Sequence, residues 1–255
     1  MALFCDGPIS DAADLQRYEN AILSVASAES IDIGAKITMA QEDLANEILL
    51  FLIRRRPYRD YAWGTQQDRD LKDVVVTDPL RPWHIHKTLS LVYRDAYNNQ
   101  LNNRYLGKWT EYEQLAQASA LTYFQIGVGL VANPVPKAGA PSLSIAVGAG
   151  SGGMFYVAAT WVSGAGGEGA PSESVQLSTS AGQQLVATVS EPPAGVTGWN
   201  VYVGASPATL ALQNPSPLAT SSSWTMTSGP NSGAALPSGQ KPTWYVVDER
   251  VIERG

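Results

Sequence analysis

Residues 133–141 have the sequence Asn-Pro-Val-Pro-Lys-Ala-Gly-Ala-Pro, and the hydrophobic pattern of the chain changes at this stretch. Before it, apolar residues recur every three or four positions, which is the spacing of amphipathic helices. After it, apolar residues alternate with a period of two, which is typical of β-strands. We therefore expect a linker at 134–141 between a helical domain, 1–133, and a β-rich domain, 142–240, in an α+β chain.

The composition changes at the same place. Residues 1–133 hold 13 of the 17 Lys and Arg residues and 17 of the 23 Asp and Glu residues, whereas most glycines and prolines come later. Residues 241–255 (Lys-Pro-Thr-Trp-Tyr-Val-Val-Asp-Glu-Arg-Val-Ile-Glu-Arg-Gly) regain charge. We expect this last segment to form a separate, extended C-terminal arm.

The first domain is expected to be an antiparallel bundle of four helices. The first helix begins behind a cap at Ser10 or Asp11, and the second follows Asp32. The third begins near Pro82, and the fourth follows a break at 102–103. The apolar stripes of the four helices are Leu15, Tyr18, Ile22 and Val25; Ile33, Ile37, Ala40, Leu44, Ile48 and Phe51; Ile85, Leu89, Val92 and Ala96; and Tyr105, Trp109, Tyr112, Ala116, Ala120 and Tyr123.

The second domain is expected to contain seven short strands bounded by Gly, Pro, Ser or Asn. This number and spacing of strands favour a β-sandwich. The glycine-rich stretch Gly148–Gly153 is expected to be a hairpin turn or loop between the first two strands. The strands are Leu143–Val147, Phe155–Val162, Val175–Leu177, Leu185–Val189, Trp199–Val203, Leu210–Leu212 and Trp224–Thr227.

Several classes of protein are disfavoured by composition. With 44% apolar and 16% charged residues, the chain can bury a core and is not broadly disordered. Its longest apolar run, Ile48–Ile53, is far shorter than the roughly 18 residues that cross a bilayer, and no secretory signal is expected. A single cysteine, Cys5, suits synthesis in a reducing cytoplasm. A net charge of -6 argues against gripping nucleic acid through bulk electrostatics.

Few residues point to catalysis, a cofactor or a metal. His84 and His86 are the only histidines; an extended His-x-His pair could supply two metal ligands, but no further ligands at metal spacing complete a site. A hydrolase would have to use one of these histidines, and no Gly-x-Ser-x-Gly elbow is present. Gly148–Gly153 lacks the Gly-Lys-Ser/Thr ending of a phosphate loop. We expect no enzyme, no cofactor and no metal site.

The β-rich domain resembles a known family. Tyr156–Val162, then Gly166-Gly167-Glu168 and Ala170-Pro171-Ser172, resemble the last two strands of fibronectin type III and related immunoglobulin-like domains, with Tyr156 as a candidate tyrosine corner. This resemblance implies an immunoglobulin-like β-sandwich. Four later segments resemble the early and middle strands of that family, which would be a permuted order. They are Leu185–Val189, Pro192–Pro193, Gly198–Val203 and Trp224–Thr225.

The helical domain resembles the head-to-tail adaptor, or connector, proteins of tailed bacteriophages. The resemblance covers residues 10–133 and rests on Leu15-x-x-Tyr18-Glu19, Ile31-Asp32, Arg104–Trp109 with Tyr112-Glu113, and Gly127–Val131. It implies a structural virion protein that forms a dodecameric ring under the portal, in the neck. The implied partners are the portal, a tail or head-completion protein, neighbouring copies, and genomic DNA that passes through the lumen without sequence-specific binding. No membrane partner is expected, and the immunoglobulin-like domain would be a decoration.

Two groups of residues are candidate contact sites. Arg54, Arg55 and Arg56 form the one basic cluster; they either complement the C-terminal end of a helix or contact a partner or DNA. The long loop expected between Pro57 and Pro82 holds Trp63, and the C-terminal arm holds two adjacent aromatic residues. Tryptophan and tyrosine are enriched at interface centres. We expect portal or neighbour contacts by Trp63, Trp244, Tyr245, Arg250 and Arg254.

The chain has an alternative interpretation as a non-catalytic binding module of a fibre or adhesin. In that case the sandwich recognises a surface glycan or protein, and the helices only multimerise it. The size of the oligomer distinguishes the two, because a large closed ring suits a portal partner and a dimer or trimer suits a fibre.

Overall fold

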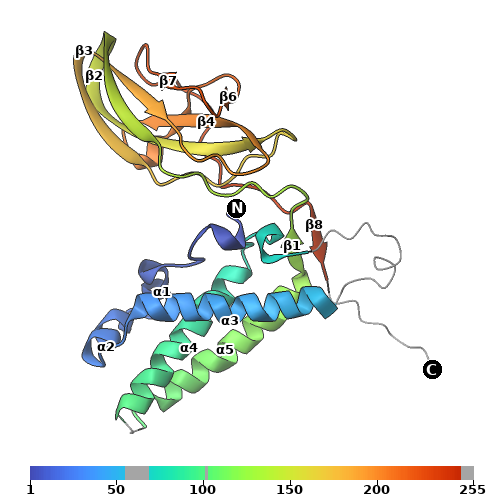
Figure 1. Ribbon diagram of the computed structural model, residues 1–255. Helices are drawn as coiled ribbons and strands as arrows, with labels where there is room; N and C mark the ends of the chain where they lie inside the picture. Colours follow the sequence, from blue (N-terminus) through green and yellow to red (C-terminus); the bar gives the residue numbers. More distant parts are fainter. Residues whose placement is uncertain (55–68, 101–102, 248–255) are drawn as a thin grey trace, which may run out of the picture. The chain divides into compact units, whose positions relative to one another are not determined.

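The computed structural model describes residues 1–54, 69–100 and 103–247. Helices come first and a mostly antiparallel β-sheet region follows, so the α+β class is confirmed (Figure 1). The chain divides into two compact units. The helical unit comprises Gly7–Leu130 and Pro242–Gly255, and the sheet unit comprises Met1–Asp6 and Val131–Lys241. Each unit therefore contains segments from both sides of the predicted boundaries.

The helical unit contains three long helices, α3, α4 and α5, which pack together around an apolar core. The apolar stripes predicted from the sequence supply this core, including Leu15, Leu89, Val92 and Tyr112. Short helices and strands complete the unit. The elements are α1 (Ala12–Tyr18), α2 (Ile22–Ala28), α3 (Ile33–Arg54), η3 (Leu71–Asp73), α4 (Leu80–Gln100), α5 (Leu106–Ile126), β1 (Val128–Leu130) and β8 (Trp244–Val246).

The predicted first helix is in fact two short helices. Asp11 caps α1, because its carboxylate accepts a hydrogen bond from the Asp14 amide at 2.8 Å. At Glu19 the backbone turns to an extended conformation and α1 ends. The Glu19 carboxylate accepts a hydrogen bond from the Tyr112 hydroxyl at 3.0 Å, so a tertiary contact is made where the periodicity alone predicted a continuous helix.

The sheet unit holds one antiparallel sheet of six strands in the order β5-β4-β2-β3-β7, with β6 also paired to β4. Two of its strands are much longer than predicted. The first two predicted strands are joined in β2, and the next two are joined in β3. The strands are β2 (Ser142–Ser163), β3 (Val175–Thr188), β4 (Val196–Gly204), β5 (Ala211–Leu212), β6 (Leu218–Ala219) and β7 (Trp224–Thr225).

The prediction of a turn or loop at Gly148–Gly153 was wrong, because these glycines lie inside β2. The pairing of β2 with β3 shifts register between Val147 and Ser151 at this point. A Cβ atom on Gly150 would lie 1.7 Å from the carbonyl oxygen of Gln183, so only glycine lets β3 pass this closely. The glycines thus bend a continuous strand pair where the sequence suggested a break.

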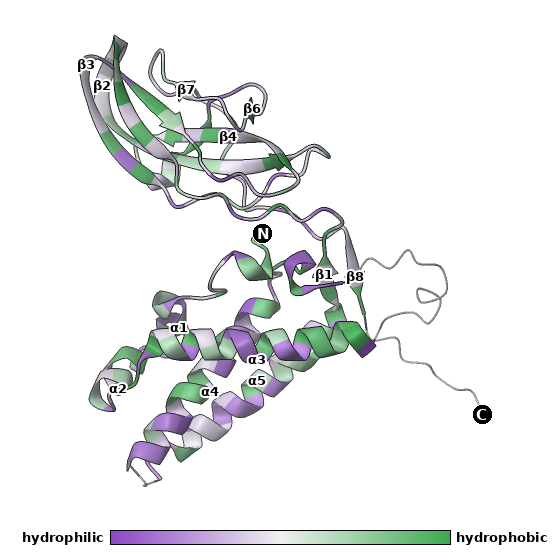
Figure 2. Cartoon of the chain, viewed as in Figure 1, coloured by the Kyte–Doolittle hydropathy of each residue, from purple (hydrophilic) through white to green (hydrophobic). Residues whose placement is uncertain are grey.

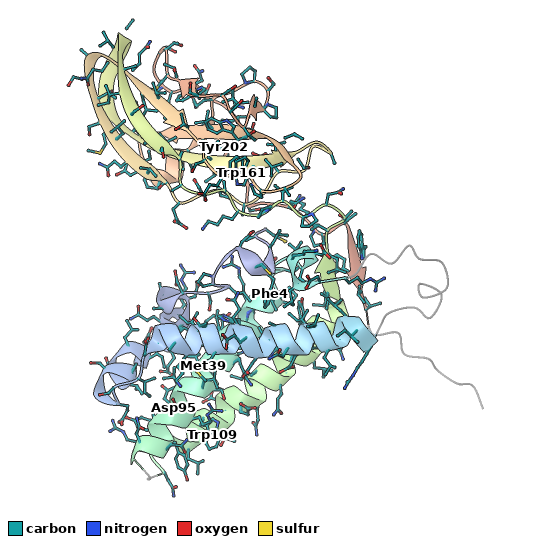
Figure 3. All side chains as sticks on the ribbon, viewed as in Figure 1. Phe4, Met39, Asp95, Trp109, Trp161 and Tyr202 are labelled. Atoms are coloured by element: carbon teal, nitrogen blue, oxygen red, sulfur yellow. The ribbon has the colours of Figure 1, made fainter. Side chains whose placement is uncertain are left out.

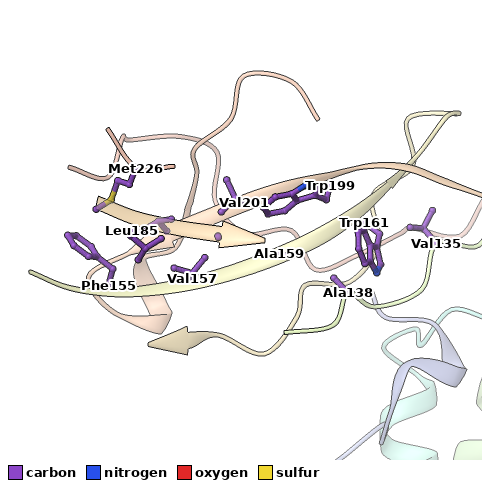
Figure 4. Close-up of a cluster of buried hydrophobic side chains, with 12 residues drawn as sticks. Val135, Ala138, Phe155, Val157, Ala159, Trp161, Leu185, Trp199, Val201 and Met226 are labelled. Carbon is purple, nitrogen blue, oxygen red and sulfur yellow. The ribbon is translucent and has the colours of Figure 1, made fainter. Parts of the chain in front are cut away.

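The core of the sheet unit receives side chains from β2, β3 and β4 together, including Phe155, Trp161, Leu185 and Trp199 (Figure 4). Val135 and Ala138 also belong to this core, at 2% and 4% exposure. The predicted linker 134–141 is therefore part of the sheet unit. The Gln240 side chain ties the two ends of the sheet unit together. It accepts a hydrogen bond from the Val135 amide at 2.7 Å and donates one to the Asn133 carbonyl at 2.9 Å.

In the described part of the chain, no helix combines the length and the apolarity needed to cross a membrane.

We expect the helical unit to fold without the sheet unit. A chain that lacks Met1–Asp6 and carries a short Gly-Ser linker in place of Val131–Lys241 should keep its helical circular dichroism and a cooperative thermal transition, because the two cores share no residue. As a control, the same chain without Pro242–Gly255 should lose stability, because β1 loses its partner strand. A broad, non-cooperative transition in the first chain would contradict independent folding.

Candidate functional site

Three of the predicted contact residues are described, and they lie in the β1–β8 strand pair and at the end of α3. Trp244 and Tyr245 lie in β8, and Arg54 is the exposed last residue of α3. Arg55, Arg56, Trp63, Arg250 and Arg254 lie outside the described residues. The described candidates therefore belong to one unit of the chain.

The C-terminal strand pairs within its own chain, whereas the sequence suggested that it docks on a partner. β8 is antiparallel to β1, with Leu130 opposite Trp244 and Val128 opposite Val246. On its other side β1 meets residues 74–76 of the expected long loop, because the Val75 amide donates to the Gly129 carbonyl at 3.0 Å. Part of that loop thus lies beside β1 as a third extended segment, and β1 is buried.

Two glycines allow β8 to approach. Gly127 ends α5 with a φ of 109°, and a Cβ atom there would lie 2.8 Å from the Val247 side chain. A Cβ atom on Gly129 would lie 2.8 Å from the Pro242 ring. The glycines of the Gly127–Val131 segment therefore have a structural purpose, which is close passage of the C-terminal strand.

Exposed apolar side chains lie on and directly after β8, in the last turns of α3 and in the last turns of α5. Phe51 of α3 stacks on Phe124 of α5 with ring centroids 4.7 Å apart, which brings the ends of these helices together beside β8. The hydropathy colouring shows apolar residues at the end of α3 and along β1 (Figure 2). We call the following six residues, each between 42% and 60% exposed, the β8 surface: Leu50, Ile53, Leu121, Ile126, Tyr245 and Val247.

Sequence reasoning found Tyr245 but missed the other members of the β8 surface. A usable signal was present, because α5 and the residues after it carry no charged side chain between Gln114 and Pro136. An exposed helix face without charge is unusual in a soluble monomer, and such faces mark interaction sites when apolar residues gather on them.

The motif residues of the helical domain meet in a polar cluster at the other end of α5. The Glu19 carboxylate accepts from the Tyr112 hydroxyl and pairs with the Lys108 ammonium, each at 3.0 Å. Burial by itself would raise the pKa of the Glu19 carboxyl, but these two bonds together hold that pKa below its ordinary value. Trp109, labelled in Figure 3, packs near them on Tyr97. The cluster therefore joins the end of α1 to α5.

The two histidines also join elements. His84 is fully buried; its Nε2 donates to the Ile37 carbonyl at 3.1 Å, and its Nδ1 accepts from the Ser10 hydroxyl at 2.7 Å. His86 lies toward α5, with its Nδ1 2.9 Å from the Ser119 hydroxyl. Because α4 is helical here, the two rings do not converge as an extended His-x-His pair would.

The sheet unit has one polar cluster of its own. The Glu168 carboxylate accepts hydrogen bonds from Thr160, from Asn200 at 2.8 Å and from Tyr202, which is labelled in Figure 3, at 2.8 Å. Asn214 extends the network by donating to Asn200 at 2.9 Å. One carboxylate oxygen with three donors is fully used, so this cluster fixes β2 against β4 and the segment after β5.

We expect Gly127→Ala to detach β8. A non-glycine residue at this φ costs about 1–3 kcal/mol, and the contact with Val247 adds to it. The free energy of unfolding should fall by at least about 2 kcal/mol, and amide exchange of Val246 should accelerate. The matched control is Gly107→Ala in α5, where a Cβ atom has no neighbour within 4 Å and helix propensity should raise stability slightly. Equal stability of the two variants would refute the tight approach.

The burial of His84 predicts that the free energy of unfolding depends on pH. Burial lowers the pKa of His84 to about 4 in the folded chain, despite its bond to Ile37, against 6.5 for an ordinary histidine. The unfolded chain therefore binds the extra proton between these values, and the free energy of unfolding should fall by about 3 kcal/mol as pH drops from 6.5 to 4. In denaturant titrations, the free energy of unfolding of His84→Gln should fall less than that of the parent over the same pH range. An identical pH profile in both proteins would contradict a buried neutral ring.

In the described part of the chain, His, Cys, Asp and Glu side chains form no group of three that could hold a metal ion. No family model, curated protein or solved structure matches the sequence or the fold. The chain's own motifs and surfaces are therefore the basis on which its function is proposed.

Proposed function

We propose that the chain is a structural virion protein, a head-to-tail adaptor that sits in a ring under the portal of a tailed bacteriophage and joins the head to the tail. In this role the helical unit contacts the portal and neighbouring copies, and genomic DNA passes through the lumen. The chain is made in the host cytoplasm and becomes part of the neck. It has no catalytic task.

The observation that carries this proposal is the β8 surface. Six large apolar side chains around the C-terminal strand are about half exposed, although the helices beneath them are already packed. Such patches mark protein-binding surfaces. The aromatic ring of Tyr245, 48% exposed on a strand held by backbone hydrogen bonds, is a suitable anchor for a partner.

The motifs shared with adaptor proteins support the same proposal. Leu15, Ile31, Tyr105, Trp109 and Tyr112 come from three separate segments and pack in or against one core. They are thus residues that maintain the helical fold. A resemblance in core residues supports a helical fold like that of the adaptor proteins. The proposed contact surface, the β8 surface, lies elsewhere on the helical unit.

We further propose that the sheet unit is an immunoglobulin-like sandwich and a decoration of the adaptor. β2 and β3 bend at their glycines, and side chains from both arms of the bend enter one core, as two facing layers would. The unit is inserted between Leu130 and Pro242, with its ends tied by Gln240. Inserted domains with neighbouring ends are readily added to an existing scaffold.

The charge of the chain fits a DNA channel. A ring of copies that each carry a net charge of -6 repels the phosphate backbone, so DNA can slide without being held. Arg54 is exposed next to the β8 surface. We place it toward the portal or a neighbouring copy, with its charge also complementing the C-terminal end of α3.

Replacing both Tyr245 and Val247 by serine should weaken binding to assembled portal rings about 30-fold to 100-fold, because truncating two interface anchors costs roughly 2–3 kcal/mol. Sedimentation of the chain with portal rings measures this. The control is Met39→Ser on α3, which is 40% exposed and lies outside the β8 surface. Both proteins should unfold like the parent, since exposed side chains contribute little to stability.

Two outcomes would contradict the proposal. If the parent chain fails to bind portal rings at all, the adaptor function is wrong. If the parent binds and the serine variant binds equally well, the adaptor function stands but the β8 surface is not its portal contact. A stable dimer or trimer that binds a glycan, and no portal, would favour the fibre or adhesin interpretation.

A further inference from the structure

The sheet unit carries a two-stranded ribbon with both edges open. Between Ser142 and Phe155, β2 is paired only with β3, because its pairing with β4 begins at Tyr156. On the opposite side of the ribbon, β3 meets β7 only at Val186 and Ala187. In the part of the chain that the structure describes, no other strand pairs with these two edges.

Apart from the register shift at the glycine bend, the open edges lack the usual protection against pairing. Natural edge strands are blunted by charged side chains, proline or short length. β2 is 22 residues long and β3 is 14 residues long, and neither contains Asp, Glu, Lys, Arg or Pro. An unprotected edge of this length can accept another strand through its free backbone N–H and C=O groups.

Apolar side chains are exposed along the same ribbon. Val147 is 96% exposed, and Ile145 and Met154 are 46% and 51% exposed. Val147 and Ile145 precede the glycine bend, and Met154 follows it. A strand added to the β2 edge would cover these side chains and satisfy the backbone at the same time.

We propose that the ribbon joins copies of this chain head to tail: the β2 edge of one copy pairs with the β3 edge of the next. This inference rests on the proposed function, because a closed ring requires each copy to use two different surfaces. It adds a second joint, in the sheet unit, to the contacts that the helical unit makes with neighbouring copies in the proposed ring.

A second copy fits the ribbon for electrostatic reasons. Each copy has a net charge of -6, so two copies repel each other overall. The ribbon carries no charged side chain, so two copies that meet there bring no like charges together. Both edges belong to every copy, and the pairing therefore propagates from one copy to the next.

The test uses lysine to block one edge at a time in the full chain. One variant carries Ser144→Lys and Val147→Lys on the β2 edge, and another carries Gln176→Lys and Ser178→Lys on the β3 edge. All four side chains are exposed, so the fold should be retained. The matched control places two lysines on α5, at the exposed positions Gln114 and Ala118, which lie outside the β8 surface.

Light scattering at high protein concentration should give the parent and the α5 control a mass that rises well above one chain of 27.2 kDa. Each blocked variant alone should stay at 27.2 kDa, and their equimolar mixture should reach twice that mass and no more, because each supplies the edge that the other lacks. Circular dichroism of the variants confirms that they are folded.

Three results would overturn the inference: a parent that stays monomeric, a blocked variant that associates like the parent, or a mixture that remains monomeric. Portal binding is measured on the same proteins. If the chain binds portal rings but its copies do not pair through the ribbon, this inference is wrong and the proposed function stands. If copies pair through the ribbon but the chain does not bind portal rings, the proposed function is wrong and the ribbon joint stands.

Discussion

The antiparallel pairing of β1 with β8 is the constraint on which the rest of the structure depends. It places Leu130 opposite Trp244, so everything between them must leave the helical unit and return to the same point. Closing a loop of this length would cost about 4 kcal/mol in chain entropy. The folded sheet unit offsets most of that cost, because Gln240 already holds its two ends together through Asn133 and Val135. The strand pair and the sheet unit therefore stabilise each other through the chain ends.

Much of the helical unit could be predicted from the sequence because its information is local. The stripes that begin at Ile33, Ile85 and Tyr105 lie in α3, α4 and α5, and their apolar residues are the buried ones. Prediction failed where a distant residue decides the backbone. Helix α1 ends at Glu19, whose side chain contacts Tyr112 and Lys108, both about ninety positions later. No sequence pattern near Glu19 indicates these contacts.

The glycines of the sheet unit show a second limit. Gly148–Gly153 has the composition of a turn, yet the same residues can bend a continuous strand when a partner strand passes within contact distance. The distinction depends on Gln183, which is more than thirty positions away. The candidate site had the same difficulty. The segment expected to be an extended arm does contain a strand at Trp244, but its partner β1 has only three residues and follows a glycine. Such a short strand gives no periodic signal.

The two units use charge in opposite ways, and this difference assigns them different contacts. In the helical unit, charged side chains link the helices, as Lys87 does with Asp43 at 3.2 Å and Lys108 with Glu19 at 3.0 Å. The six residues of the β8 surface, in contrast, carry no charge, which suits an apolar contact with a partner. In the sheet unit, the ribbon has no charge and its free groups belong to the backbone. A backbone edge recognises any extended strand, so selectivity must come from geometry. Fixed positions around a ring would supply that geometry, since only neighbouring copies then present an edge at the right place.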